Sequence, residues 1–127
     1  MDNHHDNNPL DELGARFLAA YIVIDKILGE LPIPIRIPSI ERDDWNSRIG
    51  VAALERARAA LRDLPLDSLA ASILDKMILD WHTAHAIADL TELVGPQPHR
   101  LEAMAYALTR IGASVDLVQQ RLRDTEN

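Results

Sequence analysis

The chain has no cysteine among its 127 residues, which excludes disulfide bonds, thiolate metal sites and a cysteine nucleophile. Aromatic residues make up only 4% of the chain, so aliphatic side chains and alanine must fill the core. The longest uncharged apolar run covers residues 17–24 and falls well short of the ~20 residues that cross a bilayer. The polar, acidic stretch MDNHHDNNPLDE also differs from a secretory signal. We therefore expect a cytoplasmic protein with no membrane partner.

Basic residues are scarce as well: 13 Lys and Arg stand against 20 Asp and Glu, for a formal net charge of −7. Phosphate contacts need concentrated Lys and Arg, so this balance predicts no nucleic-acid partner. The acidic residues gather in the N-terminal residues 1–12 and in residues 66–94. This charge favours a basic partner surface, because opposite charge speeds the encounter of two proteins.

Motifs of the common catalytic and cofactor-binding sites are absent from the sequence. No serine lies in a GxSxG or SxxK context, and the five glycines are isolated rather than gathered in a phosphate-binding loop. The spacings HExxH and ExxH, which bind metals in zinc proteases and di-iron bundles, do not occur. The sequence therefore predicts no catalytic residue and no cofactor. A non-enzymatic role is favoured, and the question of enzymatic activity stays open.

Helical patterns cover most of the chain. They predict helices from Pro9 to about Gly29, from Asp43 or Asp44 to Leu64, from Leu66 to Val94 and from Pro98 to Asp124. Proline at 65 and the Gly/Pro-rich residues 95–98 leave only short loops, which makes the last three helices antiparallel neighbours. The predicted fold is an all-α four-helix bundle. It forms one domain of residues 9–124, between flexible termini at residues 1–8 and 125–127.

Two of the predicted helices have unusual surfaces. The first carries Leu18, Ile22 and Val23 opposite its main apolar face, and a helix apolar nearly all round is buried in its own bundle or against a partner. The second has a heptad seam made mostly of Gly and Ala: Asn46, Gly50, Ala53, Ala57, Ala60 and Leu64. Small side chains at such positions let a neighbouring helix approach closely.

Residues 31–40, LPIPIRIPSI, form an extended Pro/Ile-rich crossover between the first two helices, which we call the strap. In an extended chain Ile33, Ile35 and Ile37 share one face, while the prolines remove N–H donors from one edge. The strap is thus predicted to be an edge strand or a polyproline-like segment that lays its isoleucines into an apolar groove. That groove belongs either to its own bundle or to a second protomer or partner, and the sequence leaves both interpretations open.

The two tryptophans are predicted to differ in their surroundings. Trp81 falls on the apolar stripe of the third helix, so we expect it in the core with its indole N–H bonded to one acceptor. Trp45 follows the strap and lies off the Gly/Ala seam. It either packs beneath the strap or is exposed as an anchor for a partner.

His82, His85 and Asp89 lie at i, i+3 and i+7 on one side of the third helix, and imidazole with carboxylate suits Zn, Mn or Fe. The group sits beside the apolar stripe rather than on it, and a single helix does not enclose a metal ion. We therefore predict a solvated acidic helix face with no metal. These three residues are kept as the alternative set of metal ligands.

Together these patterns favour a small acidic interaction or regulatory protein that binds another protein and is itself a homodimer. The predicted interaction residues are Ile22, Val23, Ile33, Ile35, Ile37 and Trp45. One alternative is a ligand-binding bundle whose apolar pocket is closed by the strap. The other is a metal-binding protein or enzyme that uses the His/Asp face of the third helix.

Overall fold

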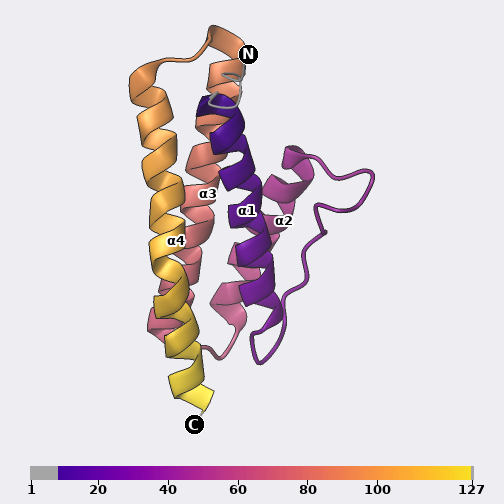
Figure 1. Ribbon diagram of the computed structural model, residues 1–127. Coiled ribbons are helices and arrows are strands. Elements are labelled where there is room, and N and C mark those ends of the chain that lie inside the picture. Colours follow the sequence, from indigo (N-terminus) through magenta and orange to yellow (C-terminus); the bar gives the residue numbers. More distant parts are fainter. Residues whose placement is uncertain (1–8, 127) are drawn as a thin grey trace, which may run out of the picture.

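The computed structural model describes residues 9–126, which form four α-helices and no strand (Figure 1). The helices are α1 (Pro9–Gly29), α2 (Ser47–Asp63), α3 (Ser68–Val94) and α4 (Pro98–Glu126). The predicted four-helix bundle is therefore confirmed. The tail predicted at residues 1–8 lies outside the described residues, and residues 125 and 126 of the predicted flexible C-terminus belong to α4.

Helix α3 lies at the centre of the bundle, because it packs against each of the other three helices. Figure 1 shows α1, α2 and α4 running in one direction and α3 in the other, with α2 and α4 on opposite sides of α1. The short loops around Pro65 and at residues 95–97 make α2, α3 and α4 antiparallel neighbours, as predicted. The longer connection, residues 30–46, returns the chain along the outside of the bundle, so α2 runs parallel to α1 (Figure 1).

The helix ends follow from a few side chains and one glycine. Asn46 Oδ1 accepts the N–H of Ile49 at 3.1 Å, and Asp67 Oδ2 accepts the N–H of Ala70 at 3.0 Å, so these residues cap α2 and α3. Gly95 ends α3 in the left-handed region, at φ 91°, which favours glycine. Helix α2 begins later than predicted because the chain turns before it, where Asp44 pairs with Arg42 at 2.9 Å.

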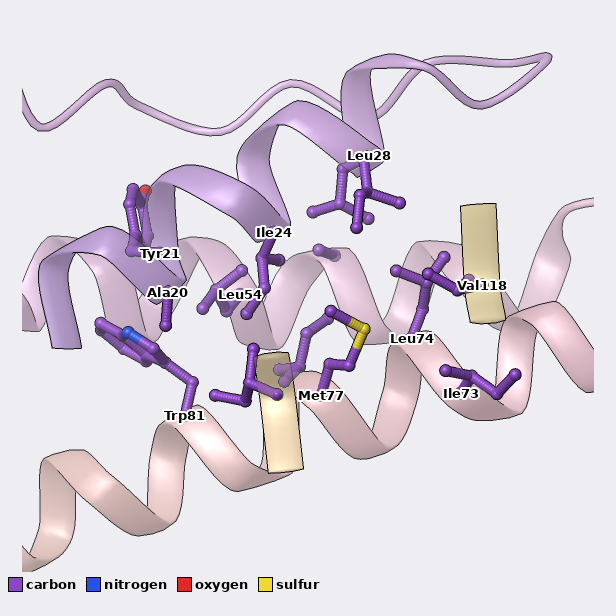
Figure 2. Packing of buried hydrophobic residues seen from close by; sticks show 14 of the residues in the cluster. Ala20, Tyr21, Ile24, Leu28, Leu54, Ile73, Leu74, Met77, Trp81 and Val118 are labelled. Carbon is purple, nitrogen blue, oxygen red and sulfur yellow. The ribbon is translucent and has the colours of Figure 1, made fainter. Parts of the chain in front are cut away.

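Aliphatic side chains fill most of the core, and Figure 2 shows how those of α1 and α3 interlock. Ile24, Leu28, Leu74, Met77 and Ile78 are among the side chains that have no accessible surface. On α2, the predicted seam is buried at three small residues, Gly50, Ala53 and Ala57. No helix within residues 9–126 combines the length and apolar character needed to cross a bilayer.

The strap lies against its own bundle. The N–H of Ile35 donates to the carbonyl of Leu28 at 3.0 Å, and the hydroxyl of Tyr21 donates to the carbonyl of Pro38 at 2.7 Å. Ile35 and Ile37 are half-buried against the core, as their shared face predicts. Ile33 departs from the prediction with 52% of its surface exposed, because residues 31–33 still belong to the bend that follows α1.

Candidate functional site

Four of the five aromatic residues of the chain gather where α1, α2 and the middle of α3 meet. The fully buried ring of Trp81 stacks on Phe17, with ring centroids 4.3 Å apart and an interplanar angle of 16°. Trp81 Nε1 donates to the carbonyl oxygen of Phe17 at 3.0 Å. The predicted core position of Trp81, with one hydrogen-bond acceptor, is confirmed, and this bond joins α3 to α1.

Gly50 of α2 allows this cluster to close. A Cβ atom added at Gly50 would lie 2.9 Å from Trp45 Cζ2, 3.1 Å from Trp81 Cη2 and 3.2 Å from Tyr21 Cε1. Trp45 packs edge-on against Tyr21, with ring centroids 5.2 Å apart, so it lies against its own core. Its enclosed Nε1 is not aligned for a hydrogen bond with any described residue. Burial raises the pKa of Tyr21, and the indole N–H of Trp45 opposes part of that rise.

His85 lies at the edge of the aromatic cluster and joins three elements. Its ring lies nearly parallel to that of Trp81, with centroids 6.0 Å apart, and 6.1 Å from that of Phe17. Nε2 of His85 is 3.1 Å from Ser47 Oγ at the first residue of α2, and Nδ1 is 3.7 Å from Asp89 Oδ2 one turn along α3. The imidazole thus packs against the rings of Trp81 and Phe17, and its two nitrogens face the hydroxyl of Ser47 and the carboxylate of Asp89.

A pocket of about 380 Å³ opens beside His85, between the start of α1, the end of α3 and the start of α4. Its apolar wall includes Leu10, Phe17, Ala88 and Met104, and its polar side includes Ser47, His85, Asp89 and Glu92. A mostly apolar pocket with a few converging polar groups is the usual form of a small-molecule site. None of the residues that line it belongs to the strap, so the pocket differs in place from the strap-closed pocket predicted as an alternative.

Ser47 is the residue of this site that sequence reasoning missed. It has no motif around it, and 38 positions separate it from His85. The only local signal is its place after the capping residue Asn46, and many helices begin in the same way. The contact with His85 arises only from the way α2 docks on α3.

His82 contacts a different part of α2 from His85. Its Nε2 lies 2.7 Å from Glu55 Oε2, yet this enclosed nitrogen is not aligned for a hydrogen bond, so the contact is electrostatic. Burial lowers the pKa of His82 below its ordinary value of 6.5, against the opposing effect of Glu55. Nearby Arg58 and His85 add to the lowering.

The alternative metal ligands His82, His85 and Asp89 therefore do not converge. His82 faces Glu55, whereas His85 faces Ser47 on one side and the 64% exposed carboxylate of Asp89 on the other. Within residues 9–126 no group of three or more His, Asp or Glu side chains is placed to hold a metal ion. The reason is that each histidine on this helix face finds its own partner on α2.

The predicted interaction residues are spread over three places. Ile22 is 49% exposed on the outer face of α1, and Val23 lines a second hollow of about 380 Å³ between α1 and α4. Small residues form much of this α1/α4 groove: Ala19, Ala20 and Gly112. Arg16 lies in its wall and donates to Thr109 Oγ1 across it at 3.0 Å. Ile33, Ile35, Ile37 and Trp45 lie instead along the strap and its end, as described above.

Comparison with known proteins finds no matching family model, no similar curated protein and no similar solved structure.

Proposed function

We propose that the protein acts in the cytoplasm as an interaction or regulatory protein, and that it pairs with a second copy through the outer face of α1. The observation that carries the proposal is a row of exposed apolar side chains on this face. Leu18 and Ile22 are one turn apart on α1 and are 38% and 49% exposed. Ile22 also borders a hollow that is lined by Ser39 and Ile40 of the strap.

An exposed apolar ridge suits a two-fold pairing. Each protomer packs its Leu18–Ile22 ridge against the same ridge of the other, which makes the contact self-complementary. The exposed Ile33 offers a further apolar side chain besides Ile22.

The test compares charge placed on two different faces. Native mass spectrometry and light scattering are expected to find a dimer for the wild type and a monomer for the double variant Leu18→Glu, Ile22→Glu. The variant should stay folded by circular dichroism, since both side chains are already substantially exposed. Leu90→Glu, on the exposed outer face of α3, is the matched control and should remain dimeric. A monomeric wild type, or a control that dissociates in the same way, would contradict the proposal.

A second candidate function is the binding of a small apolar ligand in the pocket beside His85. The observation that favours it is the pocket's combination of apolar walls with Ser47 and His85 on one side. Both tryptophans lie in the aromatic cluster that borders the pocket, so a nitroaromatic ligand should quench their fluorescence saturably. Unchanged fluorescence across a series of nitroaromatic compounds would argue against it.

A further inference from the structure

We infer that Ser47, His85 and Asp89 form an acyl-transfer site that hydrolyses small, neutral carboxylic esters; this inference rests on the pocket beside His85 binding a ligand. Nε2 of His85 has a hydroxyl partner within hydrogen-bonding distance, and Nδ1 faces a carboxylate slightly beyond that distance. Nε2 lies 3.1 Å from the hydroxyl oxygen of Ser47, and Nδ1 lies 3.7 Å from a carboxylate oxygen of Asp89. A serine, a base and a group that orients the base are the three parts of an activated serine nucleophile.

The imidazole is well positioned to act as the base. Only 15% of its side chain is exposed, and the rings of Trp81 and Phe17 lie 6.0 and 6.1 Å from it. An Nδ1–H directed at Asp89 leaves Nε2 free to accept the Ser47 proton, which is the tautomer that general-base catalysis needs. The longer distance to Asp89, a 64% exposed carboxylate, predicts weak orientation and a modest rate.

The start of α2 supplies donors for the charge that develops on the substrate. Ser47 and Arg48 are the first two residues of the helix, and the capping side chain of Asn46 takes the N–H of the third, Ile49. The N–H groups of Ser47 and Arg48 have no acceptor among residues 9–126. Free amides at a helix start stabilise an oxyanion, both by hydrogen bonding and through the helix dipole.

The pocket sets the class of substrate. Its volume of about 380 Å³ and its apolar wall of Leu10, Phe17, Ala88 and Met104 fit a short alkyl or aryl group. Asp89 and Glu92 line the same pocket, and their negative charge disfavours anionic substrates. A neutral ester therefore fits better than a carboxylate- or phosphate-bearing one.

The reaction follows with water as the only co-substrate. Ser47 Oγ bonds to the ester carbonyl carbon while its proton moves to His85 Nε2, and the tetrahedral intermediate then releases the alcohol, which takes that proton. Water attacks the acyl-serine and gives a proton to His85, and collapse releases the carboxylic acid as the proton returns to Ser47 Oγ. One ester and one water become one acid and one alcohol.

The experiment measures hydrolysis of 4-nitrophenyl butyrate together with labelling by a fluorophosphonate. We expect turnover by the wild type and one phosphonyl group on the peptide that contains Ser47. Ser47→Ala and His85→Gln should each lower kcat/KM by about 100-fold or more, and Asp89→Asn, at an exposed position that cannot unfold the bundle, by about 10-fold. Ser72→Ala and His99→Gln, at exposed positions outside the pocket, are the matched controls and should keep the wild-type rate.

A second measurement separates catalysis from binding. The ketone in which a CH₂ group replaces the ester oxygen should quench tryptophan fluorescence in both the wild type and Ser47→Ala. Binding of the ketone without hydrolysis of the ester overturns the acyl-transfer site and leaves the ligand pocket standing. Failure of both overturns both proposals. Full activity in Ser47→Ala, or labelling at another residue, overturns the role of Ser47.

Discussion

The two ends of the core differ in what fills them, as Figure 2 shows. At one end Leu28, Leu74 and Val118 are fully buried and aliphatic, so they contain no polar atom that needs a partner. At the other end the indole N–H of Trp81 donates to the carbonyl of Phe17, and the hydroxyl of Tyr21 donates to the carbonyl of Pro38. The aliphatic end contributes burial alone, whereas the aromatic end also determines how α1, α3 and the strap are joined.

The two ends also differ in how they meet solvent. At the surface of the aliphatic end, Arg121 of α4 donates to both carboxylate oxygens of Asp67, the capping residue of α3, at 2.8 and 2.9 Å. These hydrogen bonds from Arg121, with one from the amide of Ala70, lower the pKa of Asp67 to about 2. The aromatic end instead opens into the pocket beside His85. Stability is therefore expected to depend most on the first end, and ligand chemistry on the second.

Leu74 at the aliphatic end and Met104 at the pocket test whether the two ends differ in packing. Leu74→Ala should lower the free energy of unfolding by roughly 4 kcal/mol, because the cavity it leaves is enclosed on all sides. Met104→Ala should cost only about 2 kcal/mol, since Met104 lines the open pocket and its cavity merges with space that water already reaches. Urea unfolding of both variants measures the difference. Equal losses would show that the two ends do not differ in packing.

The next effect concerns the close approach of α2 at the aromatic end. Gly50→Ala should destabilise the protein by about 1–3 kcal/mol, because the new methyl group overlaps the rings of Trp45, Trp81 and Tyr21. Gly14→Ala is the matched control on α1, where an added Cβ meets nothing within 4 Å. It should stabilise by about 0.5–1 kcal/mol through helix propensity. Thermal unfolding checks both, and a Gly50→Ala variant as stable as the control would contradict the tight packing.

A smaller effect tests how the strap is held at the aromatic end. Tyr21→Phe removes the hydroxyl that donates to Pro38 and should cost about 1 kcal/mol. Hydrogen exchange at the amide of Ile35, which bonds to Leu28 in the same contact region, should become faster. Tyr106→Phe, at an exposed tyrosine on α4, should change neither quantity. Unaltered exchange in Tyr21→Phe would mean that the apolar contacts of Ile35 and Ile37 alone hold the strap.

The fold was predictable because its signals are local. Prolines and glycines end the helices at the expected places, and helical periodicity marks the faces that pack in the core. The start of α2 was predicted a few residues too early, because Asp43 and Asp44 resemble helix-starting residues while Asn46 performs the capping. The strap was predicted as extended, but the bend that exposes Ile33 depends on how α1 ends.

The site was much less predictable, because its parts come from different helices. Their spacing on one helix face groups His82 with His85. In the structure each contacts a different residue of α2, His82 contacting Glu55 and His85 contacting Ser47. That arrangement requires α2 to lie close to α3, which depends on three aromatic rings meeting at Gly50. No spacing within the sequence encodes such a contact. The predicted interface and homodimer remain proposals for the same reason: they depend on contacts beyond one chain.

Stability is also expected to depend weakly on pH through His82. Burial lowers the pKa of His82 below 6.5, helped by Arg58 and His85 and opposed by Glu55. The unfolded chain binds a proton near pH 6.5, whereas the folded protein binds it only at lower pH. Between these two values the unfolded state holds more protons, so the contribution of His82 to stability falls as the pH drops through 6.5 toward the folded pKa. Above that window this contribution is constant.

His82→Gln removes this contribution, so the melting temperature of the variant should fall less than that of the wild type as the pH is lowered from 7.5 through 6.5. His99→Gln, at an exposed position on α4, is the control and should keep the wild-type dependence. A variant slope equal to that of the wild type would show that His82 takes up its proton in the folded state as easily as in the unfolded one. In that case the carboxylate of Glu55, 2.7 Å from Nε2, would fully offset the effect of burial on the pKa of His82. Water would then reach this side of α3 more easily than its packing indicates.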